Sequence, residues 1–178
     1  MGVGAVIDHW GTTPEERRRP FPCDDVLPGH EWALFRAVTV GAPPAVVFRW
    51  LCQLKLAPYS YDLVDNRGRR SPRHLVPGVE RLAVGQRVAI FRIASFAPDE
   101  HLTISVRGHR AFGDVAISYV VVPHGPGATR LVAKIVTVPA RGPLGAVLRP
   151  LLPAGDLVMM RRQLLNLKAR AEATALRP

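Results

Sequence analysis

Apolar and polar residues alternate along four stretches in the middle of the chain: 86–93, 101–106, 114–122 and 129–138. The second stretch is the clearest, because Leu102, Ile104 and Val106 fall on one face and polar residues lie between them. A period of two residues is typical of a strand that is buried on one side. Short turns containing glycine or proline separate the four stretches, so the pattern predicts an antiparallel meander.

Helical spacing marks two further stretches. Apolar residues recur every three or four positions in residues 45–55, directly after a double proline, and again in the longer stretch 154–175. Residues 32–40 are rich in strand-forming residues and predict a strand before the first helix. Residues 59–64 predict a short strand. The polar, proline-containing residues 65–77 predict a loop, which we expect to act as a lid.

The order of these elements predicts one α+β domain. A meander of this size twists and curls, and its apolar concave face must be covered. The last helix is the only long element that can cover it. A curled antiparallel sheet wrapped around one long C-terminal helix is not easily filled by side chains. We therefore expect an internal cavity that holds a small, mostly apolar molecule.

This domain is expected to cover residues 32–178, after an N-terminal lead-in over residues 1–31. Thr13 and Pro14 begin a short helix in the lead-in, with threonine as the cap and proline in the first turn. Pro20 and Pro22 limit its length. We expect the lead-in to be loosely tethered to the domain.

The formal net charge of +10 comes almost entirely from arginine. The arginines are scattered along the chain, which favours a solvated surface over a nucleic-acid partner. Two cysteines imply no disulfide framework. No signal peptide or membrane-spanning run is evident, so we expect a cytoplasmic protein without stable membrane insertion. The histidines lack metal-ligand spacing and no nucleotide fingerprint is complete, so we predict neither a metal nor a cofactor.

Four short motifs resemble those of the START-like superfamily, also called the SRPBCC group, which includes polyketide cyclases and lipid-transfer proteins. Residues 42–51 (Ala-Pro-Pro-Ala-Val-Val-Phe-Arg-Trp-Leu) resemble its opening, and residues 59–62 (Tyr-Ser-Tyr-Asp) resemble a motif of one bacterial branch. Residues 127–132 and 160–168 resemble its late strand and final helix. The resemblance implies a helix-grip fold over about residues 32–175. Residues 54–58 lack the glycines usual in that branch, so the resemblance does not carry over a ligand type.

Candidate site residues fall into two sets. A tyrosine hydroxyl, a carboxylate and an imidazole beside an apolar cavity are able to move protons, which makes Tyr61, Asp62 and His74 the catalytic candidates. Their alternative roles are structural, at the rim of the cavity or in an exposed loop. The residues expected to contact a ligand are Trp50, Leu54, Tyr59, Phe91, Ile104, Tyr119, Leu157, Met160 and Leu164. Plain core packing is the alternative role for the apolar residues among them, and packing outward under the lead-in is the equal alternative for Tyr119.

Three functions follow from this sequence. The first is a carrier or binding protein for a small hydrophobic molecule, polyketide-like or lipid-like. The second is a cyclase or dehydratase of natural-product biosynthesis that uses the same cavity. The third is a basic module that binds an anionic surface through the charge of +10. Formation of a homodimer is left open.

Overall fold

Six antiparallel strands form one open sheet in the computed structural model, which describes residues 7–61 and 68–176 without the side chains of Pro143, Leu144 and Leu148. The order across the sheet is β1-β6-β5-β4-β3-β2. The strands are β1 (Trp32–Val40), β2 (Arg87–Val88), β3 (Phe91–Ala97), β4 (His101–His109), β5 (Gly113–Pro123) and β6 (Thr129–Val138). The predicted meander is therefore confirmed, with the first strand added beside the last.

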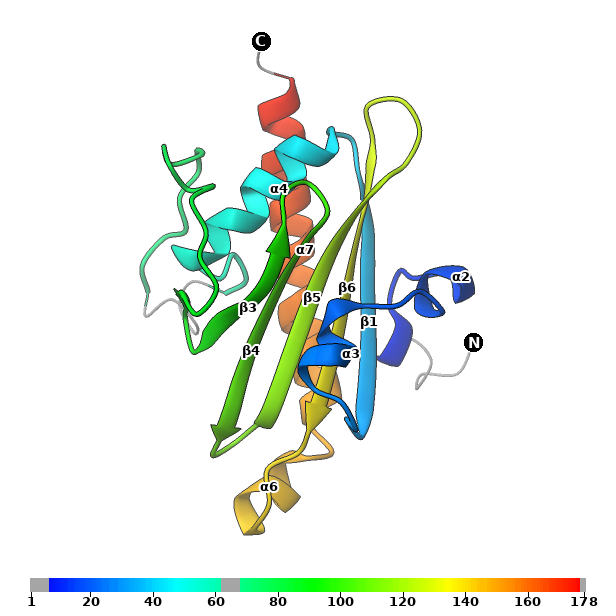
Figure 1. The fold of residues 1–178 in the computed structure, drawn as a ribbon, viewed down its shortest axis with the longest axis vertical. Coiled ribbons are helices and arrows are strands. Elements are labelled where there is room, and N and C mark those ends of the chain that lie inside the picture. The colour runs from blue at the N-terminus through cyan, green and yellow to red at the C-terminus, as the bar shows by residue number, and fades with distance from the viewer. Residues whose placement is uncertain (1–6, 62–67, 177–178) are drawn as a thin grey trace.

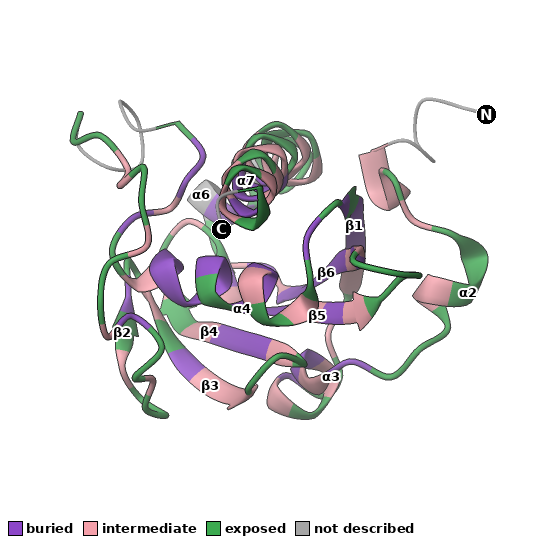
Figure 2. Ribbon diagram, turned by 90° about the horizontal axis from the view of Figure 1, so that it is seen from above, coloured by how far each residue is buried: buried purple, intermediate pink, exposed green. Residues whose placement is uncertain are grey.

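Two helices cover one face of this sheet, which we call the inner face (Figure 1, Figure 2). They are α4 (Pro44–Cys52), extended by the 3-10 turn η1 (Gln53–Lys55), and the long α7 (Leu152–Ala175). A short helix, α6 (Pro143–Leu148), precedes α7. The combination of one antiparallel sheet and one long C-terminal helix is the α+β, helix-grip arrangement that the sequence predicted. The ends of the sheet do not meet, because β1 and β2 lie at opposite edges.

Two predicted strands are corrected by the structure. Residues 86–93 form a hairpin instead of one strand, because Ala89 has a φ of 53° and the chain reverses there. The turn residues are apolar, so the pattern gave no sign of it. Residues 59–61 are not a strand, since Tyr59 has a φ of 56° and leaves the extended conformation. Residues 62–64 of that prediction lie outside the described part of the chain.

Apolar side chains gather on both faces of the sheet. The inner cluster lies between the sheet, α4 and α7, and it takes Leu131 and Ile135 from β6. The outer cluster lies on the opposite face and takes Val132 and Val136 from the same strand. This alternation is the period-two pattern of a strand buried on both sides. Both clusters are apolar, so β6 offers no solvent face.

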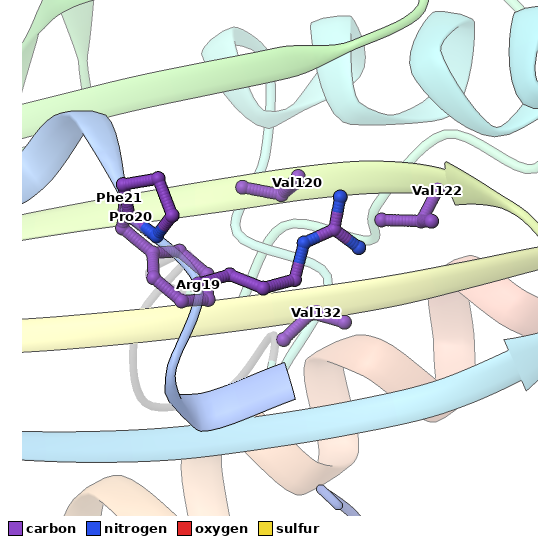
Figure 3. A pocket seen from close by; sticks show the side chains of 6 residues that line it. All are labelled: Arg19, Pro20, Phe21, Val120, Val122 and Val132. Atoms are coloured by element: carbon purple, nitrogen blue, oxygen red, sulfur yellow. The ribbon is translucent and has the colours of Figure 1, made fainter. Parts of the chain in front are cut away.

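The described part of the lead-in packs mainly on the outer face, with Trp10 against the inner cluster, and is not loosely tethered as expected. Its described part includes the short helices α2 (Pro14–Arg17) and α3 (Pro22–Val26), and Thr13 caps the first of them as predicted. Phe21 and Cys23 are almost fully buried in the outer cluster. A small pocket, with room for about one water molecule, lies here between the lead-in and strands β5 and β6 (Figure 3).

Polar contacts fix the lead-in to the sheet. The backbone N–H of Cys23 donates to Ser118 Oγ at 2.8 Å, and the Thr103 hydroxyl lies 2.8 Å from the same oxygen. Lys134 Nζ donates to Asp24 Oδ1 at 2.6 Å. These bonds cross the outer cluster, where a lost partner leaves a buried polar group unsatisfied.

Replacing Ser118 by alanine is expected to lower the free energy of unfolding by about 1–3 kcal/mol, because the buried Cys23 N–H loses its acceptor. Urea denaturation of the wild-type and variant chains measures the change. The matched control is Ser105→Ala, which removes a half-buried hydroxyl from β4. Equal effects of the two substitutions would contradict the role of Ser118 in holding α3.

Candidate functional site

Three residues of the inner face lie in one row across neighbouring strands. Arg36 of β1 is paired with Ala133 of β6, and Tyr119 of β5 is paired with the same alanine. Strands are about 4.8 Å apart, so the Cα atoms of Arg36 and Tyr119 are about 10 Å apart. The small alanine between them leaves room for long polar side chains above it. We call this arrangement, with its partners on α7, the inner polar row.

Arg36 is a charged residue with no exposed surface. Its Nη2 donates to Asp156 Oδ2 at 2.8 Å, and its Nη1 donates to the carbonyl of Phe35 at 2.9 Å. Its Nε is buried and has no hydrogen-bond partner. Nε and Nη2 each point an N–H to the same side of the guanidinium group, so these two donors form one edge that is able to bind two acceptors. Asp156 accepts from Nη2 only. The N–H of Nε is free to bind an acceptor oxygen.

Asp156 lies one turn into α7, above Arg36. Burial raises the pKa of its carboxyl to about 6, although the neighbouring Arg36 acts in the opposite direction. Up to Met160 the described side chains of α7 are exposed or half-buried. The Arg36–Asp156 pair therefore lies under the less tightly packed end of the helix. A carboxyl with this pKa is able to accept and release a proton near neutral pH.

Tyr119 is fully buried on the other side of Ala133. Its hydroxyl donates to Gln163 Oε1 at 2.7 Å, and Gln163 Nε2 donates in turn to the carbonyl of Pro58 at 2.7 Å. Burial raises the pKa of the Tyr119 hydroxyl far above its usual range, so it stays protonated and acts as a donor. Asp156 and Gln163 are seven positions apart and share one face of α7.

A second polar centre ties the loop after residue 68 to the inner cluster. The side chain of Gln53 donates to the Tyr59 hydroxyl at 2.8 Å and to the carbonyl of His74 at 3.1 Å, and it accepts from the N–H of Val76 at 2.8 Å. Tyr59 packs edge-on against Trp50, with 5.9 Å between the ring centres. These contacts hold the loop in place beside the interior.

The structure brings most of the predicted ligand-contacting residues together in the inner cluster. Leu157 is half-buried on α7, and Phe91 is half-buried and packs against the cluster. The other predicted residues are buried members of it, namely Trp50, Leu54, Tyr59, Ile104, Tyr119, Met160 and Leu164. That they contact a ligand stays a prediction, as does the internal cavity.

Two of the three catalytic candidates, Tyr61 and His74, lie at the surface in this structure. The Tyr61 side chain is 40 % exposed, and His74 is also exposed and contributes a backbone carbonyl to Gln53. Asp62 lies outside the described residues. A catalytic role for these three residues stays a prediction, whereas the group of the inner polar row that titrates near neutral pH is Asp156.

Sequence reasoning missed Arg36, Asp156 and Gln163. Leu34, Arg36 and Val38 are two positions apart along β1, so their side chains lie on the same face of the sheet. The alternating pattern therefore places the charge of Arg36 on the buried face. Asp156 and Gln163 lie within the apolar stripe of the last helix. In each case the signal was a polar residue at a position that the pattern assigns to the core.

Among the residues that the structure describes, no helix is long and apolar enough to cross a membrane. Within the same part of the chain, no three histidine, cysteine or acidic side chains lie close enough together to hold a metal ion.

No protein-family model matches the sequence, and no curated protein matches it. Several solved structures match the fold. A protein from Mesorhizobium loti is 15% identical with a TM-score of 0.53, and the match covers 82% of this chain and 100% of that one. The Zhui aromatase/cyclase from a Streptomyces species is 14% identical with a TM-score of 0.52, over 79% and 93% of the two chains. The self-sacrificing resistance protein CalC from Micromonospora echinospora is 15% identical with a TM-score of 0.50, over 82% and 97%. The chain therefore shares the fold of these structures.

Proposed function

We propose that the chain binds a small, mostly apolar molecule between its sheet and α7, and that it acts as a carrier or binding protein. The observation that carries this proposal is the inner polar row. Burying an ion pair costs several kcal/mol per charge before the attraction between the partners is counted. A core that served packing alone would be at least as stable with apolar residues at Arg36 and Asp156. Few, well-placed polar groups in an apolar interior are typical of a ligand site.

The inner polar row defines how such a molecule would be held. Its apolar body would contact the inner cluster, and an acceptor oxygen would take the free N–H of Arg36 Nε. Most side chains of the cluster are buried, so the molecule would enter by displacing some of them. Met160 is suited to this, because an unbranched thioether adapts its shape at low cost. The aromatase/cyclase among the structures of similar fold supports a site of this type.

Native mass spectrometry of freshly purified protein is the first test. We expect a fraction of the chain to carry an extra mass that is lost on denaturation. Titration with 2-acetonaphthone, an apolar ring system with one carbonyl, then measures binding directly. Absence of a co-purifying molecule together with no binding of this probe would refute the proposal.

Tyr119→Phe tests whether the inner polar row contributes to binding. Losing the hydroxyl leaves Gln163 Oε1 without its donor, so the row is disordered next to the ligand. We expect the probe to bind about tenfold more weakly, corresponding to one hydrogen bond of about 1–1.5 kcal/mol. The control is Thr103→Val, which removes a buried hydroxyl from the outer face. If the two variants weakened binding equally, the site would not lie at Tyr119.

A second candidate function is a cyclase or dehydratase acting in the same interior. The raised pKa of Asp156 favours it, because a carboxyl that titrates near neutrality is able to take a proton from a carbon next to a ketone. The carbanion would attack a second carbonyl of the same molecule, and loss of water would follow. Incubation with a linear poly-β-ketone ester, followed by mass spectrometry, tests this: the product is lighter by one water. Asp156→Asn should abolish turnover, whereas loss of turnover in Tyr61→Phe or His74→Ala would favour the loop residues.

A further inference from the structure

A charged hairpin forms the free edge of the sheet beside β4. In it, Arg87 of β2 lies directly opposite Arg92 of β3, and both side chains are exposed. Two like charges directly opposite each other destabilise a strand pair. The register is nevertheless fixed, because Val88 is buried and Phe91 packs against the inner cluster. Burial of these two apolar residues forces the two guanidinium groups to the outside.

Exposed aliphatic residues lie at both ends of this arginine pair. Ile90 is 48 % exposed in the two-residue turn of the hairpin, next to Ala89 with its positive φ. Turns of this kind usually contain Asn-Gly or Asp-Gly, which fit the backbone and face water. Val84 is 68 % exposed in the turn that leads into the hairpin, closed by the bond from Gln86 N–H to the carbonyl of Ala83. Neither Val84 nor Ile90 is a residue type that stabilises a turn, and both side chains are exposed to solvent.

The chain around the hairpin is strongly basic. Residues 68–92, which we call the basic lobe, contain six arginines and one acid, Glu80, so about one seventh of the chain carries half of the net charge of +10. Glu80 is itself bound by Arg49, with 2.5 Å between the nitrogen and the oxygen. Arginines elsewhere have different roles: Arg36 is buried with Asp156, and Arg130 pairs with Glu16. The sequence alone suggested a scatter of charge, whereas these six arginines belong to one segment that lies beside the β2 edge of the sheet (Figure 1, Figure 2).

We propose that the surface formed by Val84, Arg87, Ile90 and Arg92 docks on an anionic lipid bilayer. The two arginines bind headgroup phosphates, which removes their mutual repulsion. The two aliphatic side chains enter the boundary between headgroups and acyl chains. Protection of an edge strand from aggregation would require the charges but not the exposed Val84 and Ile90. A single-stranded nucleic acid would require aromatic side chains for base stacking, and these four residues include none.

The docking surface lies beside the interior, because the hairpin and the segment before it both contact the inner cluster. Gln53 and Tyr59 bind the backbone of residues 72–76. Leu75, Leu82 and Phe91 pack against the inner cluster. A bilayer at this surface would therefore lie next to the apolar interior. The docking inference rests on the hairpin itself and does not depend on a ligand being found inside.

Vesicle flotation of the full chain tests the inference. We expect binding to vesicles of phosphatidylcholine mixed with phosphatidylglycerol, decreasing as NaCl is added, and no binding to phosphatidylcholine alone. Each basic side chain near an anionic surface contributes about 1 kcal/mol, so Arg87→Gln/Arg92→Gln should weaken partitioning roughly 30-fold. The variant Val84→Ser/Ile90→Ser should also weaken it, by loss of the inserted side chains.

Matched controls separate this surface from the general charge of the protein. Arg110→Gln/Arg141→Gln removes the same charge from exposed positions outside the lobe, and Val158→Ser removes an exposed aliphatic side chain from α7. Both control variants should partition to the anionic vesicles within about twofold of the wild-type protein. Equal losses in the hairpin and control variants, or no vesicle binding, would overturn the inference. The inference would also be overturned if the protein bound single-stranded DNA more tightly than anionic vesicles and if Arg87→Gln/Arg92→Gln abolished that DNA binding. Circular dichroism confirms that each variant is folded.

Discussion

Replacing Arg36 by methionine is expected to lower the free energy of unfolding by about 3–5 kcal/mol near neutral pH, the range for removing one partner of a buried ion pair. The substitution leaves Asp156 four-fifths buried without its cation. Much of the side-chain volume is kept by methionine, so the effect is chiefly electrostatic. Guanidinium denaturation monitored by circular dichroism measures the change.

The double variant Arg36→Met/Asp156→Leu is the control for this result. Removing both charges eliminates the uncompensated carboxylate, and apolar replacements of a buried pair are often neutral or stabilising. We therefore expect the double variant to recover most of the lost stability. It should also bind the carbonyl probe more weakly or not at all, because the N–H donor at Arg36 Nε is gone. A double variant as unstable as Arg36→Met would show that Arg36 acts through packing and not through its charge.

The pH dependence of stability should reveal Asp156. Its pKa is about 6 in the folded chain against an ordinary value of 3.8, so the folded state binds the proton more tightly than the unfolded state. The stabilisation from protonation is fully present below the ordinary value and is lost as the pH rises through about 6. From about pH 8 to about pH 4, wild type should gain on the order of 3 kcal/mol relative to Asp156→Asn, which does not titrate.

Comparison with Asp156→Asn is necessary because other carboxyls titrate in the opposite direction. The pKa of Glu80 is lowered by a backbone hydrogen bond and by Arg49, so its contribution is lost as the pH falls. Such effects are common to both chains and cancel in the difference between them. Urea denaturation of both chains across this pH range provides the measurement. A difference that does not change with pH would contradict the raised pKa of Asp156.

Local patterns were sufficient for the main elements of the fold. The alternation in residues 129–138 and the helical spacing in residues 154–175 correspond to β6 and α7, because burial on one face imposes a period that the sequence records. The hairpin at residues 86–93 was missed, since Ala89 and Ile90 are not typical turn residues. The residue type at position 89 does not predict a positive φ, because the surrounding structure holds Ala89 in that conformation.

The candidate site was only partly predictable. Met160 was expected near the interior and is buried there, whereas the alternation left open which face of the sheet Tyr119 occupies and the structure places it in the inner cluster. Their partners were not foreseen, because an ion pair between residues 36 and 156 joins positions 120 residues apart. The row formed by Arg36, Ala133 and Tyr119 depends on the register of three strands, which no single segment specifies.

The sequence by itself determined an α+β chain with an antiparallel meander, a long amphipathic last helix and an apolar interior between them. Only the tertiary structure decided which polar groups face that interior and where the positive charge gathers. The physical reason is that periodicity depends on neighbours along one element, whereas the pairing of Arg36 with Asp156 and the exposure of Arg87 and Arg92 depend on how separate elements pack.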